Sequence, residues 1–137
     1  MTSVLWTFLI FSFMAPALNT QPELILEIQN VEVAEGTLRI GVFDKPGAFP
    51  NDDAVLAGYY FKVTQTGTIQ ISLRDLPFGD YAIAFHHDVN DDGKLDKNFF
   101  GVPTEPYTFS NNPSAKWRQP RFEEARFSFK EDKQILS

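Results

Sequence analysis

Hydrophobic and polar residues alternate along most of the chain after residue 22, a period typical of β-strands with one buried face. In residues 23–33, Leu24, Leu26 and Ile28 lie on one face, and Glu23 and Glu27 are among the residues on the other. Residues 37–43 continue with a similar apolar-rich pattern after a turn at Gly36. The two segments are therefore predicted to form a hairpin.

The same reasoning predicts further strands, separated by Pro- and Gly-containing turns, over residues 59–65, 68–76, 80–87 and 121–130. Neither face of 80–87 is polar before His86, which predicts a central strand covered on both sides. About seven short strands at this spacing favour an all-β fold, an antiparallel β-sandwich formed by residues 21–137 as one domain. Residues 88–120 lack a strand pattern, and loops of that length are usually functional or held by a bound group.

Residues 1–20 differ from the rest and are predicted to be a signal peptide. Val4 to Met14 form an uncharged apolar run with the length of a signal-peptide core, and Ala15-Pro16-Ala17 offers a small-x-small cleavage pattern, so cleavage is expected near residues 17–20. No Lys or Arg precedes the run, which leaves a buried N-terminal helix or strand as the alternative. We expect an exported protein (periplasm, outer surface or secreted) with no transmembrane segment after cleavage.

Composition limits the function further. The 137 residues carry a formal net charge of −6, so no basic stripe is present to displace phosphate counterions and no nucleic-acid partner is expected. The chain contains no cysteine, which excludes disulfides, thiol chemistry and a lipid-modified cysteine anchor. Its size is sufficient for a domain that is stable without such cross-links.

The most informative motif follows the predicted central strand. Counted from Asp88 as position one, it matches the front half of the calcium loop D-x-[DN]-x-[DN]-G. Alternate side chains of such a curled loop point inward, glycine permits the turn, and position seven supplies a backbone carbonyl. The candidate ligands are Asp88, Asn90, Asp92, Lys94 through its backbone carbonyl, and Asp96.

The motif departs from the pattern at position twelve, where Phe99 replaces the bidentate glutamate. A further oxygen is expected from Asn98 or from Glu105. The alternative is a solvated turn whose Asp and Asn side chains bond their own backbone. If calcium orders the loop, Asp88→Ala is expected to lower stability in millimolar calcium and hardly to alter it in chelator.

Other chemistry has little support in the sequence. His86 and His87 are adjacent on a strand and point to opposite faces, so they cannot share a zinc ion. The chain has no nucleophile elbow and no phosphate-binding loop, and adjacent acidic residues are more often solvated surface than an acid–base pair. We therefore expect a protein that is not an enzyme.

The chain also resembles a bacterial family over roughly residues 24–130, and the later half carries the specific motifs. The matching motifs are the strand with Pro77, Gly79, Tyr81 and Ala82; the loop with His87, Asp88, Asn90, Asp92, Gly93, Leu95 and Asp96; Gly101, Pro103 and Glu105; Phe109 to Asn112; and Pro120, Phe122 and Ala125. They are similar to those of exported bacterial proteins grouped as domain of unknown function 2141. The resemblance implies export and a β-sandwich similar to transthyretin-like or carboxypeptidase-regulatory modules, and it implies no known activity.

The expected function is a non-catalytic binding or interaction module of the cell envelope, with calcium ordering the long loop and an unknown protein or glycan partner. Its binding surface is predicted from aromatic residues gathered in that loop, namely Phe99, Phe100, Tyr107, Phe109 and Trp117. The alternatives are a small-molecule or carbohydrate-binding protein that uses the same aromatics, a hydrolase with a metal-bound water, or a plain satellite core beneath the loop.

Overall fold

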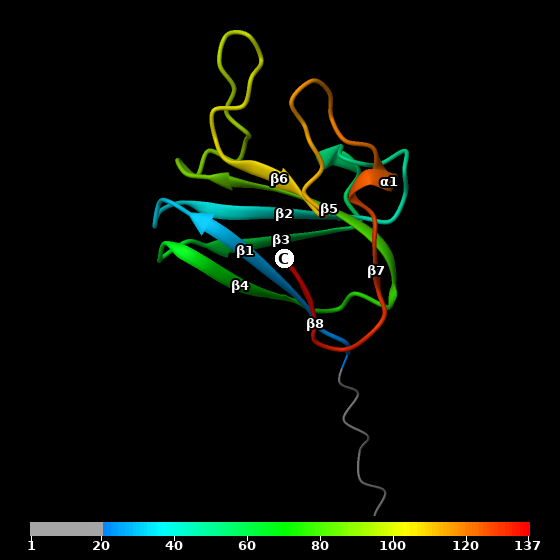
Figure 1. Cartoon of the computed structure of the whole chain (residues 1–137). Coiled ribbons are helices and arrows are strands. Elements are labelled where there is room, and N and C mark those ends of the chain that lie inside the picture. The colour runs from blue at the N-terminus through cyan, green and yellow to red at the C-terminus, as the bar shows by residue number, and fades with distance from the viewer. Residues whose placement is uncertain (1–20) are drawn as a thin grey trace, which may run out of the picture.

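The computed structural model describes residues 21–137 and shows two stacked β-sheets (Figure 1). The expected signal peptide, residues 1–20, lies outside the described residues. One sheet has the order β4-β1-β8, with β1 (Leu24–Val31), β4 (Gly67–Leu73) and β8 (Gln134–Leu136). The other has the order β3-β2-β5-β6, with β2 (Thr37–Phe43), β3 (Ala57–Lys62), β5 (Gly79–Asp88) and β6 (Tyr107–Phe109), and β7 (Phe127–Phe129) also pairs with β5. The all-β, sandwich-like prediction is confirmed, with eight strands in the described residues.

Strand pairing differs from the prediction. β1 pairs with β4, whereas β2 pairs with β3 and β5, so the predicted hairpin of residues 23–33 and 37–43 is wrong. The turn at Gly36 instead carries the chain from one sheet to the other, and the short β3–β4 connection does the same. Alternation identifies a buried face, but two strands can bury such faces either side by side or across a sandwich. The β1–β8 pair is parallel and departs from the expected antiparallel arrangement.

The main core lies between the two sheets and comes from the alternating residues. Leu24, Leu26 and Ile28 of β1 are at most 6% exposed, as are Ile69, Ile71 and Leu73 of β4. Their partners across the sandwich are Leu38, Ile40, Val42 and Ile83 of β2 and β5. Each strand thus buries the face that the sequence pattern assigns to it.

A second, smaller core covers the outer face of the β3-β2-β5-β6 sheet, the face turned away from β1 and β4. It consists of Phe43, Ala82, Phe109, Phe122 and Ala125. The predicted strand over 121–130 is divided here, because α1 (Phe122–Ala125) precedes β7. Ser110 links the segment after β6 to β5 and to α1. Its hydroxyl accepts from Ile83 N of β5 at 2.9 Å and donates to Ala125 O of α1. The motif residues 109–112 and 120–125 therefore pack together over β5, which is covered on both faces as predicted.

The connection between β2 and β3 spans residues 44–56 and includes one short 3-10 turn, η1 (Asp52–Ala54). Residues 88–106 and 110–121 form two long excursions, one before and one after β6, that rise on the same side of the molecule above β6 (Figure 1). The first starts at the last residue of the central strand β5, and the second starts directly after β6. Strand β5 thus positions the segment that carries the candidate metal ligands.

Candidate metal-binding loop

Asp88 is the last residue of β5, and its side chain is fully buried. Its carboxylate accepts hydrogen bonds from Asp92 N (3.1 Å), Gly93 N (2.9 Å) and the guanidinium Nε of Arg39 (2.6 Å). Burial raises the pKa of Asp88, but these hydrogen bonds outweigh it and hold the pKa below its usual range. Asp88 is therefore ionised at neutral pH, and its hydrogen bonds fix the loop backbone and Arg39 of the neighbouring strand β2.

The following residues form a series of turns in which side chains cap their own backbone. Asn90 Oδ1 accepts from Asp92 N at 3.2 Å, and Asp92 Oδ1 accepts from Lys94 N at 2.9 Å. Gly93 has φ +85°, the left-handed conformation that position six of the motif requires. This self-bonding is what the polar-turn alternative predicts. A curled backbone is also what the calcium-loop interpretation requires.

Glu105 reaches back to the loop from the far side of the excursion. Its carboxylate accepts from Val89 N at 2.9 Å and from Asp96 N at 3.1 Å, and Glu105 is only 9% exposed. Asn98 does not join this group, because its Oδ1 accepts from Phe100 N and Val102 N in a turn of its own. Of the two residues considered for the last ligand position, the structure places Glu105 at the loop.

Asp96 lies close to other carboxylates. Burial and the neighbouring carboxylate of Asp92 raise the pKa of Asp96, and the charge of Glu105 adds to this effect. Asn90 Nδ2 donates to Asp96 Oδ2 at 2.7 Å and partly offsets it. Asp92, Asp96 and Glu105 thus concentrate negative charge on one side of the loop.

Two residues that the sequence reasoning missed hold the loop against the sheet. Arg39 of β2 binds Asp88, and its guanidinium lies 5.2 Å from the ring centre of Tyr60. Asp91 has φ +57° and accepts from Thr37 Oγ1 and Lys62 Nζ, which lower its pKa. The alternation of β2 places Arg39 on the outer face, but pairing with Asp88 follows only from the β2–β5 register.

The donors fit calcium by chemical type, because carboxylate, amide and carbonyl oxygens are its preferred ligands. In residues 21–137, however, no three His, Cys, Asp or Glu side chains are grouped as a ready-made metal centre. The contacts of Asp88 also change one expectation. Since Asp88 binds Arg39 and two N–H groups, Asp88→Ala should lower stability in chelator as well as in calcium.

The two histidines point to opposite faces of β5. His87 is 5% exposed in the main core region, and its Nε2 lies 2.6 Å from the carbonyl oxygen of Glu35. His86 faces outward between Arg39 and Tyr107 in the strand register, and its Nε2 is buried without a hydrogen-bond partner in the described part of the chain. The opposite orientation of the two rings agrees with the alternation along a strand.

The five aromatic residues of the predicted binding surface separate in the structure. Phe109 does not belong to that surface: it is 9% exposed and packs edge-on against Phe49 at 5.7 Å in the second core. Tyr107 is partly exposed and lies against the Phe109 ring. Phe99, Phe100 and Trp117 project into solvent with 97%, 85% and 96% exposure. The satellite-core interpretation is correct for Phe109 and wrong for these three.

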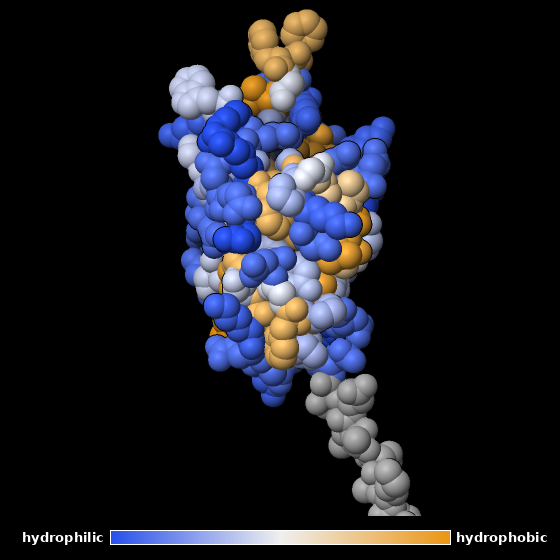
Figure 2. All heavy atoms as spheres, turned by 90° about the vertical axis from the view of Figure 1, so that its right-hand side faces the viewer, coloured by the Kyte–Doolittle hydropathy of each residue, from blue (hydrophilic) through white to orange (hydrophobic). Residues whose placement is uncertain are grey.

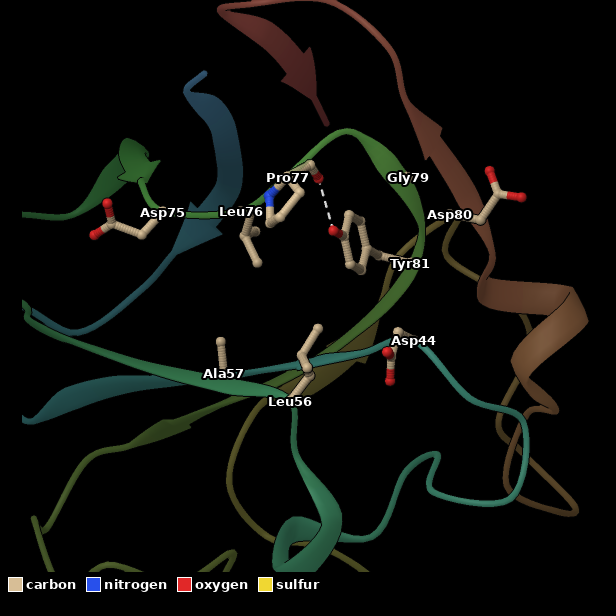
Figure 3. A pocket seen from close by; sticks show the side chains of 9 residues that line it. All are labelled: Asp44, Leu56, Ala57, Asp75, Leu76, Pro77, Gly79, Asp80 and Tyr81. Carbon is tan, nitrogen blue, oxygen red and sulfur yellow. Dashed lines mark hydrogen bonds between the residues drawn. The ribbon is translucent and has the colours of Figure 1, made fainter. Parts of the chain in front are cut away.

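An open pocket of about 480 Å³ lies at the other end of β2 and β5, away from the loop (Figure 3). Its floor contains Leu56, Leu76 and Tyr81, and the Tyr81 hydroxyl donates to Pro77 O at 2.6 Å. Asp44 and Asp75 lie at its rim. None of the predicted site residues lines this pocket.

The comparisons with known proteins agree with the motif-based resemblance. Across residues 21–137 there is no helix with the length and apolar character needed to cross a membrane. No curated protein and no solved structure matches the chain. A family model described as an uncharacterised protein conserved in bacteria, domain of unknown function 2141, matches residues 26–137. The chain therefore belongs to this family of uncharacterised bacterial proteins.

Proposed function

We propose that this protein is an exported, non-catalytic β-sandwich module whose loop 88–105 is ordered by calcium and which acts as a binding domain in the cell envelope. The observation that carries the proposal is the charge balance of the loop. Five carboxylates lie in residues 88–105, and two of them form ion pairs, Asp88 with Arg39 and Asp91 with Lys62. Within the described residues no ion pair reaches the other three, Asp92, Asp96 and Glu105. A divalent cation would offset the excess negative charge.

The proposed ligand set uses oxygens that the loop already gathers. Asn90, Asp92, Asp96 and the carbonyl of Lys94 come from the turn itself, and Glu105 supplies a carboxylate that the sequence motif lacks at position twelve. Asp88 accepts three hydrogen bonds, and a carboxylate has about four lone-pair sites. Asp88 would thus join the ligands without losing Arg39. Calcium tolerates such irregular sets better than magnesium, which demands a near-ideal octahedron.

The non-catalytic part of the proposal is supported by how these carboxylates are used. Asp88, Asp92 and Glu105 accept hydrogen bonds from backbone N–H groups of the loop, so each has a structural function. The pocket that could hold a small molecule lies at the other end of β2 and β5. Export is supported by the apolar run at residues 4–14 and by the resemblance described above.

The test is a thermal unfolding measurement in EDTA, in millimolar calcium and in millimolar magnesium. A ligand present at 100 times its dissociation constant adds about 2.7 kcal/mol, which corresponds to a rise of several degrees in Tm. We expect a rise in calcium that magnesium does not reproduce. The same Tm in all three buffers would show that residues 88–96 form a polar turn and nothing more.

A further inference from the structure

Two loop tips at one end of the molecule carry the most exposed aromatic side chains of the described chain. Phe99 and Phe100 lie at the tip of the first excursion, and Trp117 lies in the second. In Figure 1 both excursions rise on the same side of the molecule, above β6, and Figure 2 shows hydrophobic side chains projecting there. Loop tips are normally polar, so three nearly free aromatic rings at one end indicate a contact surface.

The first tip is a tight turn that prevents its aromatic rings from folding back. Gly101 N donates to Asn98 O at 2.9 Å, which makes Phe99 and Phe100 the two corner residues of a β-turn. Asn98 Oδ1 accepts from Phe100 N and Val102 N, and Lys97 and Pro103 form a β-bridge below the turn. The corner positions of this turn point away from the β-sandwich, so the turn itself keeps both phenylalanine side chains exposed to water.

The second tip is anchored on both sides of its tryptophan. Before Trp117, Ala115 packs against the second core. After it, Arg118 makes a bidentate ion pair with Glu124 at 2.7 and 2.8 Å. Trp117 therefore stays 96% exposed although the residues on either side of it are fixed.

The two tips themselves are positively charged, whereas Asp92, Asp96 and Glu105 lie at the base of the first tip and Glu124 pairs with Arg118. Residues 97–104 and 113–121 contain four cations and no Asp or Glu, namely Lys97, Lys116, Arg118 and Arg121. The chain as a whole carries −6. Exposed aromatics flanked by Lys and Arg match the interface of a bilayer, where aromatic rings sit at the headgroup level and cations meet anionic lipids.

The shape of the tips distinguishes a bilayer from other partners. Glycan and small-molecule sites are concave and place polar groups around an aromatic floor, whereas these rings stand on convex turns. Neither the pocket beside Tyr81 nor the hollow beside Asn51 and Gln119 is lined by Phe99, Phe100 or Trp117. A stable protein interface buries about 800 Å² on each partner around a packed centre, which two separated tips do not provide. A lipid bilayer does not require a packed centre, and both tips can insert into it at the same time.

We propose that residues 97–103 and 115–118 dock this module onto an anionic phospholipid bilayer by inserting Phe99, Phe100 and Trp117 at the headgroup level. The proposal names the partner of the exported module and so rests on export, but it does not depend on calcium binding by residues 88–105. The acidic loop lies at the base of the first tip, so calcium there would strengthen binding by reducing repulsion from the lipid charge.

The experiment uses two single-cysteine variants of the full chain, which contains no cysteine of its own. Val102→Cys places an environment-sensitive fluorophore at the first tip, and Glu131→Cys places one at the exposed connection between β7 and β8. Each is titrated with vesicles of phosphatidylcholine alone and of phosphatidylcholine with about one third phosphatidylglycerol. The expected result is a blue shift at position 102 and none at position 131, with anionic vesicles and in EDTA as well as in calcium.

Variants of the tips then identify the side chains responsible. Phe99→Ser with Phe100→Ser, and Trp117→Ser separately, should each weaken vesicle binding about tenfold or more. Ile135→Ser is the matched control, because it also removes an exposed apolar side chain but from β8, and it should leave binding unchanged. Lys116→Gln should weaken binding to the anionic vesicles only.

Several results would overturn the proposal. These are no binding to either vesicle, equal binding to both, or a shift at position 131 that the tip variants do not reduce. The last would show that another part of the chain, including residues 1–20, contacts the lipid. Binding of soluble glycans by the wild type but not by the tip variants, without vesicle binding, would assign the tips to carbohydrate. A calcium-independent Tm with intact vesicle binding would refute only the calcium site.

Discussion

Arg39 Nε donates to Asp88 Oδ2 at 2.6 Å and so joins the middle of β2 to the first residue of the candidate metal loop. The carboxylate is fully buried and the guanidinium is about one quarter exposed, with its other side towards Tyr60. An ion pair in this position orients the loop whether or not a metal is bound. Asp88 can therefore stabilise the protein in two ways, through the ion pair with Arg39 and through a bound metal, whereas the sequence motif alone indicates only the metal.

Asp88→Ala should lower the free energy of unfolding by about 3–5 kcal/mol, because it leaves Arg39 and two loop N–H groups without their acceptor. Urea unfolding in EDTA measures this loss without any metal contribution. Arg39→Met is the companion variant, because it removes the cation but leaves the Asp88 carboxylate to accept from the two loop N–H groups. If Asp88→Ala unfolds like the wild type in EDTA, the ion pair does not stabilise the fold.

Acid should destabilise the protein through Asp88. Its pKa is lowered in the folded state from the ordinary 3.8. A lowered carboxyl pKa contributes stability that is complete above the ordinary value and is lost as pH falls through the folded value. The wild type should therefore lose stability below about pH 4, and Asp88→Asn should be less stable at neutral pH but show a shallower acid loss. Parallel acid profiles of the two proteins would contradict this assignment.

Asp96→Asn should have opposite effects in the two buffers. The pKa of Asp96 is raised by burial and by Asp92, so its ionised form is disfavoured in the folded state at neutral pH. Without metal, the neutral amide should raise Tm above that of the wild type. With calcium, the variant should lose the calcium-specific increase, because a charged ligand is missing. Equal calcium responses of the two proteins would exclude Asp96 as a ligand.

The aromatic residues should differ sharply in their effect on stability. Phe109→Ala should cost about 3–5 kcal/mol, because the ring fills the second core beside Phe49. Phe99→Ala should change stability by less than about 0.5 kcal/mol, since the ring is 97% exposed. Denaturant titration of both variants checks the assignment of one to the core and the other to the surface.

Local patterns in the sequence predicted the strands but not their partners. Alternation in residues 24–28 identifies a buried face correctly, yet it contains no information on which strand lies beside β1. One partner proved to be β4, and two other strands lie between it and β1 in the chain. Short strands such as β6 and β8, with three residues each, are too brief for any period to be visible.

For the candidate site, spacing predicted the curled turn, because Asx residues and Gly93 determine backbone conformation locally. It did not predict Arg39 or the position of Glu105, since both depend on contacts between distant segments. Phe109 was misplaced for a related reason. Aromatic residues in a long loop look alike in sequence, and only the docking of α1 onto β5 decides which of them is covered.

The parallel pairing of β1 with β8 has a consequence for the order of folding. β1 lies in the middle of the three-stranded sheet, and β8 supplies one of its two neighbours from the end of the described chain. Until residues 134–136 have been synthesised, Leu24–Leu26 present an unpaired backbone edge, which is where strands of other chains can add. Covering this edge during synthesis or transport would keep strands of other chains from adding to β1.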